Sequence, residues 1–555
     1  MRRIISLAFA LTIGASPLTA DTMAGPYLAA THADRMADFT VAGEYYTEAL
    51  AQDPENFFLI QNALYTRIAA GDLDGATEYA RRLLESEGPK ELAVLHIISM
   101  AMRDNDFGRA NTILAENRLE LNALVRALVT GWITAANGGV EEAQAQFNEM
   151  STNPIMRFYG RFHEGLIRAM VGDYEGADAA FTNGEGDAST IHRGGLIIRA
   201  TVLSQIDRGD EAIALLQDAL ANGAQDEEVS ALLARLEAGE TIPFNQIRTA
   251  KDGLAEAFYD VALALDGDGA SRLSLVYARY AQALAAEKID YALLTADLLD
   301  SLGQYDLASA ALAEMPEDSP RAMEVGLARA DILAAGERDE EALALLVDLR
   351  NRFSDELLVH SKLGDLYHSM ERYEEANAAY GEAIARINGE PRNAHWVLFY
   401  QRGAVREQLR QFEGSEADLR QALELEPGQP IVLNHLGYSL VEQGRLVEEA
   451  QQMIEEAVAA DPQNAYIIDS LAWVRYRLGE YEAAVEPMEE AISLMPEDVT
   501  LNDHLGDIYA RVGRMREARV QWQRALSLEP DEEMATRIRE KLDEGIEALD
   551  RQDAQ

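Results

Sequence analysis

The chain has 555 residues, a formal net charge of −48 and no cysteine. A disulfide framework, a cysteine-based metal site and lipidation at a cysteine are therefore excluded. The acidic excess also excludes nucleic acid as a partner, because a phosphate backbone requires clustered Lys and Arg side chains. Two interpretations of the charge stay open: it keeps a long helical array soluble, or it steers a basic partner.

The first twenty residues have the three parts of a secretory signal peptide. A basic start at Arg2 and Arg3 is followed by an apolar run over residues 4–13 and by small residues that end at Ala20. We expect cleavage after Ala20 and a periplasmic chain that begins at Asp21. About ten apolar residues are too few to span a bilayer, which disfavours the alternative of an uncleaved anchor. No later segment has eighteen apolar residues in a row, so we expect neither a transmembrane segment nor a lipid anchor.

From Met23 onward the sequence repeats with a period of 34 residues, most clearly at 499–532. In that stretch the recurring positions hold Leu505, Gly506, Tyr509, Gly513, Ala518, Trp522, Ala525 and Pro530. Residues 465–498 repeat the spacing with Leu471, Ala472, Gly479, Tyr481, Ala484, Met488, Ala491 and Pro496. Copies begin near Met23, Phe57, Glu91, Leu124, Phe158, Arg193, Ala255, Ile289, Met323, Leu357, Trp396, Pro430, Ala465 and Val499.

The residue types at these positions predict a helix-turn-helix unit. Small residues at unit positions 8, 20 and 27 let two antiparallel helices approach closely, and apolar residues at 4, 7, 11, 17 and 24 recur with a helical period. A glycine near position 15, as at Gly479 and Gly513, ends the first helix. A proline near position 32, as at Pro530, ends the second. The predicted fold class is all-α, an α-solenoid of about fourteen units.

Residues 228–253 interrupt the period through Gly239, Pro243 and Gly253. We expect a helix over 228–238 and then a break, which is either an irregular turn or a hinge between two halves of the solenoid. The predicted organisation is listed in chain order: a signal peptide over 1–20, an N-terminal solenoid over 21–227, this linker over 228–253, a C-terminal solenoid over 254–532, and a capping helix with a tail over 533–555.

With these motifs the unit resembles the tetratricopeptide repeat, and the resemblance implies a right-handed superhelix whose first helices line a groove. It further implies that unit positions 2, 5, 9, 12 and 13 face this groove. The residues that we expect to contact a protein or peptide partner there are Asn434, Tyr438, Tyr466, Asp469, Trp473, Tyr476, Arg477, Asp503, Asp507 and Arg511. Asn can bond a peptide backbone and Arg can hold a carboxylate. The alternative for Trp473 and Tyr476 is packing between repeats.

Three segments, residues 434–438, 469–479 and 503–507, resemble the signature units of envelope tetratricopeptide proteins of Gram-negative bacteria. That group includes an outer-membrane lipoprotein adaptor that binds a carboxy-terminal processing protease and delivers peptidoglycan hydrolases to it. This chain departs from the group because it lacks the lipidated cysteine.

No catalytic, cofactor-binding or metal-binding pattern is found in the sequence. His435 and His504 share unit position 6, but they lie about two units apart and cannot share a small site. The predicted function is that of a non-catalytic periplasmic scaffold or adaptor that binds protein partners, such as an envelope protease or a peptidoglycan hydrolase. The main alternative is a structural component of a secretion, polysaccharide-export or pilus assembly machine. A further alternative is an enzyme with a site in residues 228–253.

Overall fold

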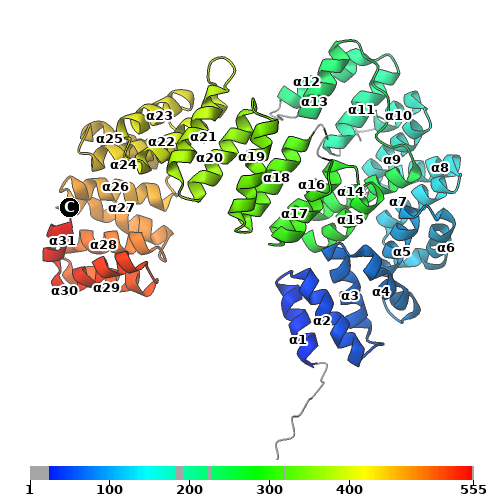
Figure 1. The fold of residues 1–555 in the computed structure, drawn as a ribbon, viewed down its shortest axis with the longest axis horizontal. Coiled ribbons are helices and arrows are strands. Elements are labelled where there is room, and N and C mark those ends of the chain that lie inside the picture. The colour runs from blue at the N-terminus through cyan, green and yellow to red at the C-terminus, as the bar shows by residue number, and fades with distance from the viewer. Residues whose placement is uncertain (1–23, 183–191, 222–226, 317–318, 320, 553–555) are drawn as a thin grey trace, which may run out of the picture. The chain divides into compact units, whose positions relative to one another are not determined.

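The computed structural model describes residues 24–182, 192–221, 227–316, 319 and 321–552. Across these residues the chain is helical, and the all-α fold class is confirmed (Figure 1). The chain divides into two compact domains: the N-terminal domain ends at Ala342 and the C-terminal domain begins at Leu343, within helix α19 (Asp339–Arg352). The predicted signal peptide over 1–20 lies outside the described residues.

In the N-terminal domain each predicted unit is a pair of consecutive helices. The pairs are α1 (Ala24–Arg35) and α2 (Phe39–Gln52), α3 (Phe57–Ala70) and α4 (Leu73–Glu85), α5 (Glu91–Arg103) and α6 (Phe107–Asn117), α7 (Ala123–Ala136) and α8 (Val140–Ser151), α9 (Arg157–Met170) and α10 (Tyr174–Thr182), α11 (Arg193–Gln205) and α12 (Gly209–Ala221), α14 (Ala250–Gly267) and α15 (Ser271–Leu284), and α16 (Ile289–Ser301) and α17 (Tyr305–Ala313). Helix α13 (Glu227–Glu237) packs on α12, α18 (Ala322–Ala335) precedes α19, and a 3-10 turn, η1 (Arg118–Glu120), precedes α7.

The C-terminal domain continues the same pattern. Its pairs are α20 (Leu357–Ser369) and α21 (Tyr373–Ala385), α22 (Trp396–Gln408) and α23 (Phe412–Leu425), α24 (Pro430–Glu442) and α25 (Val447–Ala460), α26 (Ala465–Arg477) and α27 (Tyr481–Leu494), and α28 (Val499–Arg511) and α29 (Met515–Ser527). A 3-10 turn, η3 (Asn393–His395), precedes α22. The predicted capping helix is two helices, α30 (Glu532–Glu544) and α31 (Ile546–Gln552), because the chain turns at Gly545 with a φ of 63°.

The local signals at helix ends explain why the period sets the helix boundaries. At the start of α3, the side chain of Asn56 accepts a hydrogen bond from the backbone N–H of Leu59 at 3.2 Å. At its end, Gly71 has a φ of 87°, a conformation that costs glycine little. Its N–H donates to the carbonyl of Ile68 at 3.0 Å. Helix α3 thus carries its own start and stop signals.

Helices α14 and α15 have a second role, which the period does not reveal. Besides packing on each other, α14 contacts α7 and α9, and α15 contacts α3 and α5, so the pair lies against the first helices of four earlier units (Figure 1). Arg279 of α15 donates to the carbonyl of Ala69 at 3.0 Å, and Arg272 donates to the carbonyl of Asp34 at 2.8 Å. The N-terminal domain therefore covers the first-helix side of its early units with its own chain.

The irregular stretch leads into this pair. After α13 the chain runs without helix to Thr249, where α14 begins with a capping box formed with Asp252. On the way, the N–H of Ile242 donates to Ser204 Oγ at 2.7 Å, which ties the stretch to α11. Residues 228–253 lie within the N-terminal domain, and their role as a hinge stays a prediction.

The cores of the two domains differ as a result. One apolar cluster in the N-terminal domain runs from Ala30 to Ile332 and includes residues of α14 and α15. The described clusters of the C-terminal domain are smaller and local, such as the one from Ala465 to Leu549. The second pattern is the one expected of an array in which each unit contacts mainly its neighbours. None of the described helices has the length and apolar content needed to cross a membrane.

Candidate functional site

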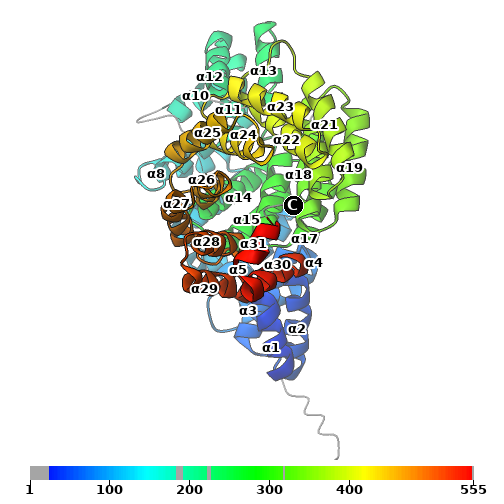
Figure 2. The same cartoon turned by 90° about the vertical axis from the view of Figure 1, so that its left-hand side faces the viewer.

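The predicted groove residues lie on α24, α26 and α28, three successive first helices of the C-terminal domain (Figure 2). Two of them are exposed: Tyr466 at the start of α26, which is 54% exposed, and Arg477 at its end. Four more are half-buried, and with the two exposed residues they form what we call the first-helix face: Asn434, Tyr438, Tyr466, Asp469, Trp473 and Arg477. This face offers aromatic, amide and guanidinium groups to a partner.

Trp473 packs between two neighbouring repeats. Its ring stacks on Tyr476 with a centroid distance of 4.7 Å and on His504 of the next unit with a centroid distance of 4.0 Å. Nδ1 of His504 lies 2.8 Å from Oδ1 of Asp469. Burial alone would lower the pKa of His504, but the Asp469 carboxylate raises it. Trp473 therefore packs between repeats and still leaves part of its ring accessible.

Tyr476 and Arg511 are held inside the domain. Tyr476 is only 2% exposed, and its hydroxyl accepts a hydrogen bond from Arg511 Nε at 3.2 Å. The guanidinium of Arg511 also donates to Asp550 of α31 at 2.6 Å. These two side chains link α26, α28 and α31.

Asp503 and Asp507 are buried beneath the C-terminal cap. Nζ of Lys541, on α30, lies 2.7 Å from a carboxylate oxygen of each. Asp507 also accepts from Nε1 of Trp522 at 2.8 Å. Burial and the neighbouring Asp503 raise the pKa of Asp507 to about 7, against the opposing effect of Lys541. Of the ten predicted groove residues, Tyr476, Asp503 and Asp507 are buried, and Arg511 is tied to Tyr476 and Asp550. The other six, which form the first-helix face, are exposed or half-buried.

Each of the two histidines at unit position 6 contacts a carboxylate of the preceding unit, which the sequence did not reveal. Nε2 of His435 lies 2.6 Å from Oε2 of Glu407, on the first helix of the preceding unit, as His504 lies beside Asp469. Burial would raise the pKa of Glu407, but the bond with His435 holds it below its usual value. These pairs join consecutive first helices.

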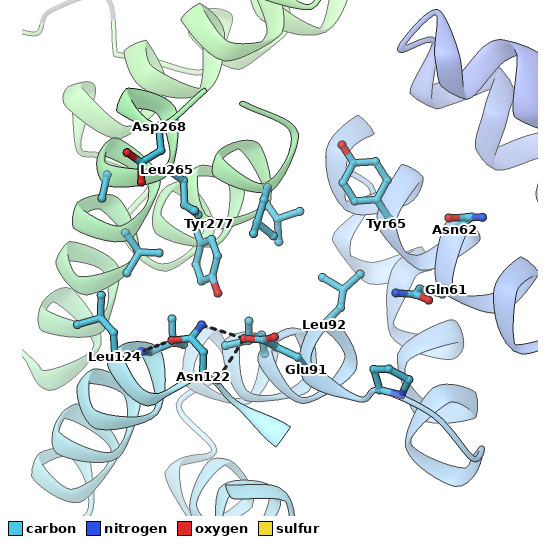
Figure 3. Close-up of a pocket in the computed structure, with 17 residues that line it drawn as sticks. Gln61, Asn62, Tyr65, Glu91, Leu92, Asn122, Leu124, Leu265, Asp268 and Tyr277 are labelled. Carbon is cyan, nitrogen blue, oxygen red and sulfur yellow. Dashed lines mark hydrogen bonds between the residues drawn. The ribbon is translucent and has the colours of Figure 1, made fainter. Parts of the chain in front are cut away.

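A separate pocket lies in the N-terminal domain, where α14 and α15 meet α3, α5 and α7 (Figure 3). Its volume is about 570 Å³. Its walls are mostly apolar and include Leu92, Leu124 and Leu265, while Glu91 and Asp268 supply carboxylates (Figure 3).

The polar groups of this pocket are held in place by hydrogen bonds. Asn122 donates to Oε1 of Glu91 at 3.0 Å. Burial and the nearby Glu91 carboxylate raise the pKa of Tyr277, so its hydroxyl stays protonated. The hydroxyl points toward the side of the pocket where Glu91 lies (Figure 3). With two carboxylates and no basic side chain among its lining residues, the pocket suits an apolar group that is uncharged or cationic.

A cluster of histidines and carboxylates is buried in the same domain. Nε2 of His192 lies 3.1 Å from Oε1 of Glu256 and 2.9 Å from Oδ1 of Asp260. Nε2 of His163 lies 3.1 Å from the other Asp260 oxygen. Sequence reasoning missed this cluster because its members come from three units and follow no local spacing.

Models of the tetratricopeptide repeat match the C-terminal domain, one over residues 400–465 and 470–532 and another over residues 359–388. The tetratricopeptide repeat is thus confirmed where the period is clearest. Such an array implies a protein-interaction scaffold and is generally non-catalytic.

Among curated proteins, TPR repeat-containing protein PA4667 of Pseudomonas aeruginosa is 27% identical over 183 residues, which make up 30% of this chain and 30% of that protein. The chain thus matches less than a third of this relative's length. Among solved structures, a tetratricopeptide repeat protein from Parabacteroides merdae has a TM-score of 0.38 and 16% identity, covering 45% of this chain and 96% of that chain. The Cut9–Hcn1 hetero-tetramer of the APC/C has a TM-score of 0.38 and 14% identity, covering 94% of this chain and 96% of that chain.

Proposed function

We propose that this chain, which carries tetratricopeptide repeats in its C-terminal domain, is a periplasmic adaptor that binds protein partners through its first-helix face. The observation that carries the proposal is the exposure of Tyr466 and Arg477 at the two ends of α26, with the half-buried Trp473 between them. Aromatic and arginine side chains are the residues that most often dominate the energy of a protein interface.

The contacts of Arg477 support this assignment. Its Nε lies 3.7 Å from Oε1 of Glu442, and both side chains are about one-third exposed. An exposed pair of this kind contributes only about 0–1 kcal/mol. The guanidinium is therefore available to a carboxylate of the partner, which it can bind through two parallel hydrogen bonds.

The same argument limits where the partner binds. In the N-terminal domain, α14 and α15 already cover the first helices α3, α5, α7 and α9. In the C-terminal domain the first-helix face carries the exposed Tyr466 and Arg477, so we expect the partner to bind there, around α24 and α26.

Export and an envelope process complete the proposal. The basic, apolar and small-residue parts of residues 1–20 support export with cleavage after Ala20. The resemblance of residues 434–438, 469–479 and 503–507 to envelope adaptors supports an envelope protease or a peptidoglycan hydrolase as the partner. No catalytic step is assigned to this chain.

The location is tested by N-terminal sequencing of the protein recovered from periplasm, which should begin at Asp21. A cytoplasmic protein that begins at Met1 contradicts both export and the envelope role.

The binding face is tested by capture of partners from an envelope extract, followed by affinity measurement with the captured protein. A double variant, Tyr466→Ala with Arg477→Ala, should lose the partner, because both side chains are exposed and their loss leaves the fold intact. The matched control is Val520→Ala on α29, which is 60% exposed and lies on a second helix. Equal capture by the double variant and the control rules out the first-helix face. Capture of secretion, polysaccharide-export or pilus proteins instead of a protease or hydrolase favours an assembly role.

A further inference from the structure

The buried cluster at the start of α11 has the composition of a metal site. His192 directly precedes α11, and Glu256 and Asp260 lie one turn apart on α14. One donor atom from each lies within 4.8 Å of the other two. Their side chains are 7%, 6% and 0% exposed. Three potential ligands therefore converge on one point in the interior of the N-terminal domain.

Hydrogen bonding does not account for this convergence. Although Nε2 of His192 is about 3 Å from a carboxylate oxygen on either side, neither it nor the two oxygens of Asp260 has a hydrogen-bond partner within the described residues. A ring N–H that points between two oxygens bonds well to neither, whereas a metal ion on that line contacts both. Buried polar atoms left unpaired cost free energy. An ion between the three groups would satisfy them.

Charge leads to the same conclusion. The two buried carboxylates repel each other, and with only one of the two facing histidines, His192 and His163, protonated, a net negative charge stays in the interior. A divalent ion bound by Glu256, Asp260 and a neutral His192 makes the site neutral. Arg321, a basic side chain that lines the adjoining cavity, already pairs with Asp290 at 2.6 Å and with Glu324 at 2.6 Å.

Outer groups hold the three side chains in position. Tyr291 donates to Oε2 of Glu256 at 2.5 Å, which leaves Oε1 directed at His192. Nε1 of Trp132 donates to Nδ1 of His163 at 3.2 Å, so the ring proton of neutral His163 is on Nε2, which faces Asp260. Such outer partners usually orient metal ligands.

The contact of His192 with the backbone is compatible with metal binding. The N–H of Gly195 points at Nδ1 of His192, at 3.2 Å, and also at the carbonyl oxygen of His192, at 3.1 Å. Binding a metal at Nε2 moves the ring proton to Nδ1, so the bond that Nδ1 accepts from Gly195 is lost. The N–H of Gly195 then keeps the carbonyl as its acceptor.

We propose that His192, Glu256 and Asp260 bind a divalent transition-metal ion, Zn²⁺, with Tyr291 and His163 as positioning residues. An imidazole with two carboxylates is a ligand set for Zn²⁺ and similar ions, whereas Ca²⁺ and Mg²⁺ prefer oxygen ligands alone. Three protein ligands leave a coordination position free. A cavity of about 190 Å³, lined by His192, Glu256 and Tyr259, lies beside the site and can supply a water molecule to that position. The ion would join α11 to α14 and so fix α14 and α15 against the earlier units.

The test is a titration of the full chain with Zn²⁺ after chelator treatment, followed by calorimetry. We expect one tightly bound equivalent. Glu256→Gln keeps the volume of the side chain and an acceptor for Tyr291 but removes the charge, and it should weaken binding roughly a hundredfold. Tyr291→Phe, which removes an outer partner, should weaken it about tenfold. Circular dichroism checks that each variant is folded.

The matched control is His504→Gln in the C-terminal domain. His504 faces a single carboxylate, that of Asp469, so this variant should keep the full equivalent of Zn²⁺. Co²⁺ serves as a second probe, because its visible bands report nitrogen and oxygen coordination and should disappear in Glu256→Gln. The proposal is overturned if the untreated and treated chains bind no Zn²⁺, if Glu256→Gln binds as tightly as the natural chain, or if Ca²⁺ displaces Zn²⁺ at equal concentration.

Discussion

Gly253 of α14 lies directly against the indole ring of Trp132 on α7. A Cβ at position 253 would come within 2.3 Å of the ring, so the two helices meet at a distance that only glycine permits. Trp132 is fully buried, packs on Phe147 at a centroid distance of 5.5 Å and donates a hydrogen bond to His163. Its ring therefore cannot shift away from α14. This contact sets how closely α14 approaches the early units.

Replacing Gly253 with alanine should destabilise the N-terminal domain by about 1–3 kcal/mol, the usual cost of overpacking. Hydrogen exchange should quicken in α7 and α14. The matched control is Gly267→Ala at the end of the same helix, where a Cβ meets nothing within 4 Å. That variant should be neutral or slightly stabilising, since alanine favours helix more than glycine does. Equal exchange in both variants would mean that α14 does not dock on Trp132.

In the last repeat, Gly506 should be equally intolerant of a side chain. A Cβ there would lie 2.5 Å from the ring of Trp522, which is buried and bonded to Asp507. Gly506→Val should cost ~1–3 kcal/mol and act locally. We expect faster hydrogen exchange in α26 to α29 and no change in α1 to α6. A uniform loss of protection along the whole chain would contradict a repeat array.

The buried His96 should make the N-terminal domain sensitive to acid. Burial and the nearby Arg103 lower the pKa of His96 to about 4, and its ring nitrogens face the hydroxyls of Thr77 and Tyr280. A histidine whose folded pKa lies below its unfolded value near 6.5 contributes stability that is complete above that pH and is lost as the pH falls toward 4.

The expected loss is roughly 3 kcal/mol between about pH 7 and pH 4. Arg103 itself pairs with Asp74 at 2.6 Å and with Asp104 at 3.1 Å. His96→Gln keeps a polar group but cannot titrate, so its stability should fall less between about pH 7 and pH 4. Parallel curves for the natural chain and the variant would show that His96 is not buried as described.

Lys541 should be the residue that holds the C-terminal cap. Lys541→Met leaves Asp503 and Asp507 buried together without a cation, a loss that typically costs about 3–5 kcal/mol. Lys541 lowers the pKa of Asp507, which burial and Asp503 raise to about 7, so its removal should raise that pKa further. The variant should therefore lose stability as the pH rises from about 4 to above 7 and regain it in acid. Hydrogen exchange of α28 to α31 measures both effects. The control, Arg539→Met, removes an exposed pair with Glu532 and should change stability by less than about 1 kcal/mol.

Trp473 should affect stability and binding together. Since its ring stacks on Tyr476 and His504 but stays half-buried, Trp473→Ala should lower the free energy of unfolding by ~1–3 kcal/mol, less than the ~3–5 kcal/mol of a fully buried tryptophan. It should also weaken partner binding by ~2 kcal/mol or more if the first-helix face binds. Arg477→Ala should weaken binding without the change in stability. Thermal melting and affinity, measured on both variants, separate the two roles, and full affinity in Trp473→Ala would place the binding face elsewhere.

The helix pairs could be predicted from the sequence because each unit carries its own signals. The repeat that begins at Val499 becomes α28 and α29 with the predicted start, and the glycine at Gly513 follows α28 as expected. These signals act over a few residues, so the 34-residue period is enough to place them.

Contacts between distant units could not be predicted in the same way. The bond from Arg279 to Ala69 spans 210 residues, and no periodic pattern marks either residue as a partner. Asp503 and Asp507 were expected to face the groove because of their unit positions. In the last repeat, however, α30 covers that side and Lys541 reaches them, whereas internal units leave the same positions half-buried, as at Asp469. The same unit position is therefore more buried in the last repeat than in an internal repeat.

The placement of α14 and α15 also bears on the order in which the protein can fold. Synthesis delivers a chain from its N-terminus, so α3, α5 and α7 emerge long before the helices that cover them. The contacts of Arg272 with Asp34 and of Arg279 with Ala69 form only when about half of the 555 residues are available. Contacts between such distant residues slow folding. Until Leu284 has emerged, the early units expose the apolar side that α14 and α15 later bury, and this interval is when the chain most needs protection from aggregation.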